Sequence, residues 1–292
     1  MRPKDLKPQH PVNVLKNVPY LWRKFTALNV RQLIDQIQEK KSYLCVGLDT
    51  DIEKLPSHFP KTTDSILAFN KAIIDATHEF AVAYKINTAF YEQYGAEGWN
   101  IMEKTLSFIP KDCFTIADAK RGDIGNTGKM YAKAFLENMD FDSITVSPYM
   151  GRDSVEPFLS YGKVAIVLGL TSNPGSADVQ QLNTDNGKVY EEVISKVASW
   201  GNPENMMFVI GATKAEKLEE IRKIVPDHFL LVPGVGSQGG SLKDVSEYGI
   251  NPNCGLLVNS SRGIIYKSND VDFAEKAREE AQLLQSQMAL YL

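Results

Sequence analysis

The segment CFTIADAK, residues 113–120, is a largely apolar run rich in residues that favour β-strands, and two of its last three residues, Asp118 and Lys120, are charged. Runs of similar character recur at residues 43–49, 81–87, 143–148, 164–171, 206–212, 229–236 and 255–261. Nearly continuous apolar character is typical of strands covered on both faces, as in parallel sheets. The intervening segments are long enough for crossover helices, so the chain is predicted to form a closed (β/α)8 barrel, the TIM-barrel architecture.

Helical patterns between the runs support this prediction. Residues 64–80 and 189–200 repeat apolar side chains at spacings of three and four, which gives each helix one apolar face. An open doubly wound sheet is the alternative, but its dinucleotide fingerprint needs glycines after the first strand, whereas the glycine-rich stretch here follows the seventh. Nothing divides the later chain, so residues 28–292 are predicted to form one catalytic barrel after an extension, residues 1–27, of unknown role.

Composition excludes several classes of partner. The 292 residues are 43% hydrophobic and 23% charged, and the net charge of -4 offers no general attraction for nucleic-acid polymers or anionic membranes. There is no apolar run of membrane-spanning length, and the N-terminus lacks the apolar core of a signal peptide. Cys45, Cys113 and Cys254 are far apart and set in apolar surroundings, so they are interpreted as core residues of a protein in a reducing, cytoplasmic compartment.

Charged residues gather where the predicted strands end. The first three runs have charged residues at or near their ends, Asp49, Lys85, and Asp118 with Lys120, and Arg262 follows the eighth. Barrel enzymes hold their catalytic groups at the carboxyl ends of strands and in the loops that follow, so these charges are candidates for chemistry.

Strand geometry predicts close contacts within this group. Side chains two apart on a strand share a face, so Asp118 and Lys120 should project together, with Ala119 turned away. Lys85, Asp118, Lys120 and Asp123 would then form an array of alternating charge, in which a lysine between carboxylates is favoured in its charged form. Any one such pair is more often a simple surface salt bridge, but their joint placement favours a catalytic site.

Two further stretches have the character of phosphate-binding loops. PGVGSQGG, residues 233–240, and NSSRG, residues 259–263, follow the seventh and eighth strands, where barrels commonly bind phosphate. Gln238 could donate from its amide and Arg262 could supply a bidentate cation. LTSNPGSAD, residues 170–178, places Ser172 at the same rim, where it could hydrogen-bond a planar, amide-rich ring as part of a closing lid.

Taken together, Asp49, Lys85, DAKRGDIGNT, TSNPG, PGVGSQGG and SRG resemble the orotidine 5'-phosphate decarboxylase family in identity and order. The resemblance covers roughly residues 28–270, and DAKRGDIGNT resembles in particular the longer bacterial subgroup, type 2. It implies conversion of orotidine 5'-monophosphate to uridine 5'-monophosphate and CO2, the last step of pyrimidine synthesis, with no cofactor and no metal. The four histidines accordingly lack metal-ligand spacing.

The resemblance also implies roles for individual residues. Lys120 would stabilise and then protonate the C6 carbanion, and Asp118 would lie near the substrate carboxylate. Substrate contacts are implied for Asp49 and Lys85 on the ribose, Ser172 on the pyrimidine amide, and Gln238 and Arg262 on the phosphate. Asp123 and Thr127 would reach the ribose held by a partner subunit, which makes the expected assembly a homodimer with sites at its interface.

Three alternatives remain at this stage. A sugar-phosphate decarboxylase or aldol-type synthase can share an Asp-x-Lys-x-x-Asp pattern on a similar barrel, but it would need a divalent metal. A Schiff-base aldolase using Lys120 is disfavoured, because neighbouring carboxylates favour the charged amine over the neutral nucleophile. Arg121-Gly122-Asp123 could also be an adhesion tripeptide, although neither a signal peptide nor a disulfide framework accompanies it.

Overall fold

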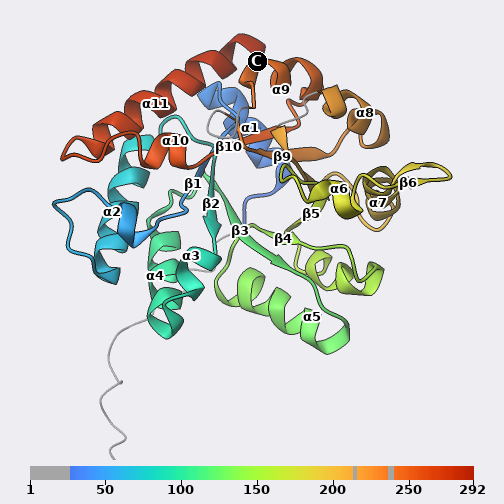
Figure 1. Ribbon diagram of the computed structural model, residues 1–292, viewed down its shortest axis with the longest axis horizontal. Helices are drawn as coiled ribbons and strands as arrows, with labels where there is room; N and C mark the ends of the chain where they lie inside the picture. Colours follow the sequence, from blue (N-terminus) through green and yellow to red (C-terminus); the bar gives the residue numbers. More distant parts are fainter. Residues whose placement is uncertain (1–26, 213–215, 236–239) are drawn as a thin grey trace, which may run out of the picture.

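The computed structural model describes residues 27–212, 216–235 and 240–292. Parallel strands close into a barrel in the order β1-β10-β9-β8-β5-β4-β3-β2 (Figure 1). The barrel strands are β1 Leu44–Gly47, β2 Ala83–Asn87, β3 Phe114–Arg121, β4 Ser143–Val146, β5 Val164–Leu170, β8 Met206–Ile210, β9 Phe229–Pro233 and β10 Leu256–Ser260. Each coincides with one of the eight apolar runs, so the predicted (β/α)8 fold is confirmed.

Helices surround the barrel and cover its outer face (Figure 1). The α-helices of the described residues are α1 Val30–Lys40, α2 Thr63–Thr77, α3 Ala89–Glu92, α4 Gly95–Phe108, α5 Gly125–Ala132, α6 Ser176–Val179, α7 Val189–Ala198, α8 Glu216–Ile224, α9 Leu242–Gly249, α10 Arg262–Ile265 and α11 Phe273–Met288. A π-helical turn, Lys133–Asn138, continues α5. The start of the barrel at residue 28 stays a prediction, because residues 1–26 lie outside the described part of the chain.

The apolar residues of the strands and helices form one core. β1, β4, β8 and β10 are buried along their whole lengths, as expected for strands covered on both faces. α2 and α11 lie side by side (Figure 1), where the ring of Phe69 stacks on that of Phe273 with centroids 5.0 Å apart. Cys45, Cys113 and Cys254 are buried and free, as the sequence predicted.

Two short elements were not predicted. β6 Asn183–Thr184 and β7 Gly187–Lys188 pair antiparallel in a hairpin between β5 and α7. The hairpin projects beyond the helices (Figure 1) and has no apolar alternation that could have announced it. Within the described residues, no helix combines the length and apolar character needed to cross a membrane.

A buried carboxylate ties β3 and β4 together at the end of the barrel opposite the charged rim. Asp142 Oδ2 accepts hydrogen bonds from the backbone N–H of Thr115 at 2.9 Å and from its hydroxyl at 2.7 Å. Asp142 Oδ1 accepts from the backbone N–H of Leu28 at 2.9 Å, which attaches the start of the described chain to the barrel. Burial raises the pKa of the Asp142 carboxyl to about 6, against these hydrogen bonds, which lower it.

Asp142→Ala is therefore expected to destabilise the fold in a pH-dependent way. Loss of the acceptor leaves buried donors unpaired, which should lower the free energy of unfolding by about 2–4 kcal/mol near pH 4. The folded protein keeps the Asp142 proton up to about pH 6, whereas an unfolded aspartate releases it near its ordinary value of 3.8. The free energy of unfolding of the wild type thus falls relative to that of the variant as pH rises through about 6. Urea titrations at several pH values would show the difference between the two proteins becoming smaller. A deficit that grows with pH would contradict the assignment.

Candidate active site

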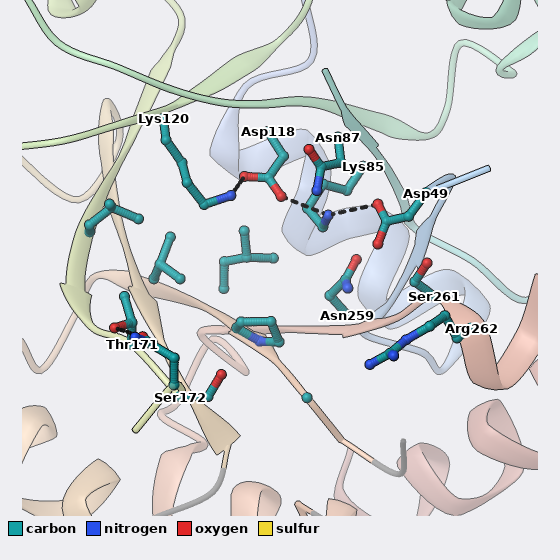
Figure 2. Close-up of a pocket in the computed structure, with 16 residues that line it drawn as sticks. Asp49, Lys85, Asn87, Asp118, Lys120, Thr171, Ser172, Asn259, Ser261 and Arg262 are labelled. Carbon is teal, nitrogen blue, oxygen red and sulfur yellow. Dashed lines mark hydrogen bonds and ion pairs between the residues drawn. The ribbon is translucent and has the colours of Figure 1, made fainter. Parts of the chain in front are cut away.

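A cavity of about 450 Å³ opens at the carboxyl ends of the barrel strands (Figure 2). Six of the predicted site residues line it together: Asp49, Lys85, Asp118, Lys120, Ser172 and Arg262. They come from β2, β3, the loops after β1 and β5, and the start of α10, which are brought to one rim by barrel closure. The prediction that the charges gather at one end of the barrel is therefore confirmed.

The charged side chains form a continuous chain of ion pairs. Asp118 accepts from Lys85 Nζ through Oδ2 at 2.8 Å and from Lys120 Nζ through Oδ1 at 2.6 Å. Lys85 Nζ also lies 3.4 Å from Asp49 Oδ1, so the charges alternate from Asp49 to Lys120 (Figure 2). Asp118 and Lys85 are nearly enclosed, whereas the Lys120 side chain is 50% exposed. The most exposed charge, that of Lys120, is thus at the end of the array.

The array holds its inner members in their charged forms. Burial opposes ionisation of Asp118, but Lys85 and Lys120 outweigh it and hold the pKa of its carboxyl below the ordinary value. Burial likewise opposes the charge on Lys85, yet Asp118 and Asp49 outweigh it and raise the pKa of that ammonium group. The site therefore presents a fixed carboxylate flanked by cations.

Lys120 reaches the cavity through an irregularity in β3. The pairing with β4 passes from Ala117 opposite Ile144 to Arg121 opposite Val146, so β3 is bulged between them. Lys120 has φ of 47°, a left-handed conformation that is uncommon for a residue with a side chain. The prediction that Asp118 and Lys120 lie together is confirmed, but its basis in regular strand alternation is wrong, because a bulge turns the Lys120 backbone.

Two of the predicted residues, Asp123 and Thr127, do not join this group. Asp123 and Thr127 do not line the cavity, the Asp123 carboxylate instead accepts from the backbone N–H of Ile124 at 2.8 Å, and Thr127 is exposed on α5. The expected array of four therefore ends in Asp49 rather than Asp123 within one chain. Gln238 lies outside the described residues, so its contact with phosphate stays a prediction.

Arg121, to which no catalytic role was assigned, is a packing residue. Its guanidinium pairs with Glu92, donates to the backbone carbonyl of Ala119 at 3.0 Å, and lies 5.4 Å from the ring centroids of both Tyr131 and Phe135. These contacts attach the end of β3 to α3, to α5 and to the π-helical turn that continues α5. An arginine held in this way is not displayed for a receptor, which disfavours the adhesion interpretation.

The loop after β5 lies against the same cavity, as predicted. The Thr171 backbone N–H donates to Gln180 Oε1 at 2.8 Å, and Ser172 lines the wall (Figure 2). Gly211 allows this approach, since a Cβ there would lie 2.7 Å from Ser172 Cα. Polar groups of this loop therefore face the side of the cavity opposite Asp49.

Arg262 stands at the start of α10, beside Ser261 (Figure 2). Its side chain lines the cavity, and none of the described residues forms an ion pair with its guanidinium. A cation without an internal counterion at the C-terminal rim of a barrel is suited to bind an anionic ligand.

Several lining residues were given no individual role from the sequence, although Pro233 and Asn259 begin the two predicted phosphate-binding loops. Asn87 ends β2 and Asn259 is the next-to-last residue of β10, and the apolar part of the wall consists of Leu168, Val209, Leu231 and Pro233. Their positions in the predicted strands could have indicated them, because each lies toward the carboxyl end of a barrel strand. An apolar wall keeps the local dielectric low and strengthens the field of the neighbouring charges.

A barrel with catalytic-type charges and, at its C-terminal rim, an arginine that no described residue pairs with defines an enzyme of a small anionic substrate. The family model described as "Orotidine 5'-phosphate decarboxylase / HUMPS family" matches residues 42–277. The chain belongs to this family.

Similar proteins support the same assignment. An orotidine 5'-phosphate decarboxylase of Flavobacterium johnsoniae is 59% identical over 266 residues, covering 90% of this chain and 97% of the relative. One of Phocaeicola vulgatus is also 59% identical, covering 89% and 98%. The structure of Leishmania donovani OMP decarboxylase superposes with a TM-score of 0.74 at 36% identity, covering 87% of this chain and 98% of that one.

Proposed function

We propose that the chain catalyses decarboxylation of orotidine 5'-monophosphate to uridine 5'-monophosphate and CO2, the final step of UMP biosynthesis. The observation that carries this proposal is the Asp49, Lys85, Asp118 and Lys120 array, built into a chain that is 59% identical to curated orotidine 5'-phosphate decarboxylases along nearly their whole length.

The chemical difficulty of this reaction explains the need for the array. Loss of CO2 from C6 leaves an electron pair in an sp2 orbital that is not conjugated with the ring carbonyls. A fixed cation next to C6 stabilises that pair, and Lys120 is the charged end of the array that faces the cavity. Lys120 then donates its proton to C6, and solvent restores the proton on the lysine.

Asp118 acts on the ground state. Its carboxylate is held ionised by Lys85 and Lys120, so it repels the substrate carboxylate when the two lie close together. Departure of neutral CO2 removes the repulsion, while the attraction between Lys120 and the new carbanion grows. Differential interaction of this kind lowers the barrier, because the transition state is stabilised relative to the bound substrate.

The remaining contacts bind the nucleotide. Arg262 holds the phosphate together with Gln238, Asp49 and Lys85 hold the ribose hydroxyls, and Ser172 binds the pyrimidine amide. The positions of Asp49 and Arg262 along one side of the cavity (Figure 2), with Ser172 across it, support this orientation.

The assay that tests the function uses the purified chain with orotidine 5'-monophosphate in excess EDTA. Loss of the orotate absorbance with release of one CO2 and one uridine 5'-monophosphate per substrate is the expected result. Activity that disappears in EDTA and returns with a divalent cation would favour the metal-dependent sugar-phosphate alternative instead.

For the assembly, we propose a homodimer in which Asp123 and Thr127 reach the partner's site. Apolar side chains are exposed near both residues: Ile124 and Met130 on or beside α5, and Tyr149 and Met150 after β4. α5 packs against the segment that follows β4, so these side chains belong to one region of the surface. Burial against a second copy would remove them from water.

Mixing two inactive variants tests the shared site. Lys120→Ala and Asp123→Ala should each be inactive alone, but a hybrid dimer contains one site with both native residues. Random reassembly should therefore restore about a quarter of wild-type activity, since half of the dimers are hybrids with one intact site each. A mixture as inactive as its components after verified subunit exchange would contradict the proposal.

For location, we propose the cytoplasm. The three free, buried cysteines fit a reducing compartment, and no disulfide joins them. Cell fractionation with a tagged chain tests this, and recovery from an oxidising compartment would overturn it.

A further inference from the structure

Thr145, on β4, makes two polar contacts with the catalytic segment although it does not line the cavity. Its side chain is fully buried. The hydroxyl donates to Asp118 Oδ1 at 3.0 Å and accepts from the backbone N–H of Lys120 at 2.8 Å. One hydroxyl thus contacts both residues to which the chemistry is assigned.

The position of Thr145 in the sheet gives these contacts their importance. Between the pairs Ala117 with Ile144 and Arg121 with Val146, β3 contains three residues where β4 contains only Thr145. A bulge of this kind interrupts the backbone ladder and leaves donors to be satisfied in another way. The Thr145 hydroxyl takes the place of the missing ladder acceptor at the Lys120 amide.

The bulge also imposes a conformation that Lys120 would not adopt unaided. A left-handed backbone is unfavourable for lysine and persists only where the surroundings hold it. Lys120 Nζ and Thr145 Oγ1 both donate to the same oxygen of Asp118. The hydroxyl therefore constrains the Lys120 backbone and the Asp118 carboxylate at once.

We propose that Thr145 is a positioning residue for the decarboxylation: it holds the bulge of β3 so that the Lys120 ammonium and the Asp118 carboxylate keep their catalytic placement. The inference rests on the proposed function. It predicts a defect in the chemical step rather than in nucleotide binding, because the proposed ribose and phosphate contacts do not involve Thr145.

Replacing Thr145 with valine and with serine tests this role. Thr145→Val keeps the shape but removes the hydroxyl, and it should lower kcat about 100-fold while changing KM less than about threefold, as expected for a small misplacement of catalytic groups. Thr145→Ser keeps the hydroxyl and should retain kcat within about fivefold. A kcat for Thr145→Val within threefold of the wild-type value would overturn the proposal.

Thr77→Val is the matched control for lost stability. Thr77 is also fully buried, and its hydroxyl bonds to the Ile73 carbonyl and the Tyr84 hydroxyl, both at 2.8 Å, away from the cavity. It should lower the melting temperature without the loss of kcat, and an equal loss of kcat in both valine variants would overturn the positioning role.

A crystal structure of Thr145→Val separates this inference from the proposed function. We expect Lys120 to leave the left-handed conformation or its contact with Asp118 to lengthen. If both are unchanged, the positioning role is wrong even when the wild-type chain decarboxylates orotidine 5'-monophosphate. If the wild-type chain has no such activity, the proposed function is wrong, and the geometry of the variant still decides whether Thr145 holds the bulge.

Discussion

Lys120→Ala is expected to lower kcat for orotidine 5'-monophosphate by at least about 10⁴-fold, since it removes both a general acid and the electrostatic stabilisation of the carbanion. The substitution leaves Asp118 paired with Lys85 at 2.8 Å, so the carboxylate keeps one cation and remains ionised. Repulsion of the substrate carboxylate should thus persist without a group to stabilise the product of bond cleavage. Steady-state rates from the decrease in orotate absorbance measure the effect.

Lys223→Ala is the control for this variant. Lys223 is a surface lysine that pairs with Glu219 on α8, and such pairs contribute little to stability. Its kcat should equal that of the wild type. A Lys120→Ala enzyme that retains more than about a tenth of wild-type kcat would mean that another group supplies the proton and the charge.

Arg262→Ala is expected to lower kcat/KM for orotidine 5'-monophosphate by about 10³-fold while the melting temperature changes little. None of the described residues pairs with the Arg262 guanidinium, so little internal structure depends on it. If binding of the phosphate helps to close the loops around the reacting ring, the loss should appear in kcat as well as in KM. Kinetics and thermal melts together separate this effect from misfolding.

Orotidine, which lacks the phosphate, provides the sharper comparison. The wild-type and Arg262→Ala enzymes should decarboxylate it at rates within about threefold of each other, because the arginine then has no anion to bind. Arg31→Ala, at an exposed arginine paired with Glu204, should leave both substrates unaffected. An unchanged kcat/KM for the nucleotide in Arg262→Ala would refute the phosphate assignment.

The barrel was predictable because most of each strand is covered on both faces and is therefore nearly continuously apolar in sequence. The grouping of Asp49, Lys85, Asp118 and Lys120 followed from the same rule, since parallel strands of a closed barrel end at one rim. The pattern of apolar runs and the charges at their ends predicted both the fold and the grouping. Neither prediction required knowledge of side-chain contacts.

The remaining parts of the site depend on contacts between distant segments. The bulge at Lys120 arises from the pairing of β3 with β4, and the sequence of β3 alone resembles a regular strand. Arg121 is held by Glu92, which lies on α3, and the role of Thr145 is visible only once its hydroxyl meets Asp118. The roles predicted for Asp123 and Thr127 would need a second copy of the chain, so they stay predictions.

The closure of the barrel between β1 and β10 has a consequence for folding. Asp49 follows the first strand and Arg262 the last, so the proposed ribose and phosphate contacts meet only after the two ends of the barrel have paired. Contacts of such long sequence separation form slowly, because the loop entropy is lost before they are made. During refolding, recovery of nucleotide binding should therefore lag behind recovery of helical circular dichroism. A nascent chain that ends before β10 would have secondary structure and two open strand edges, but no substrate site.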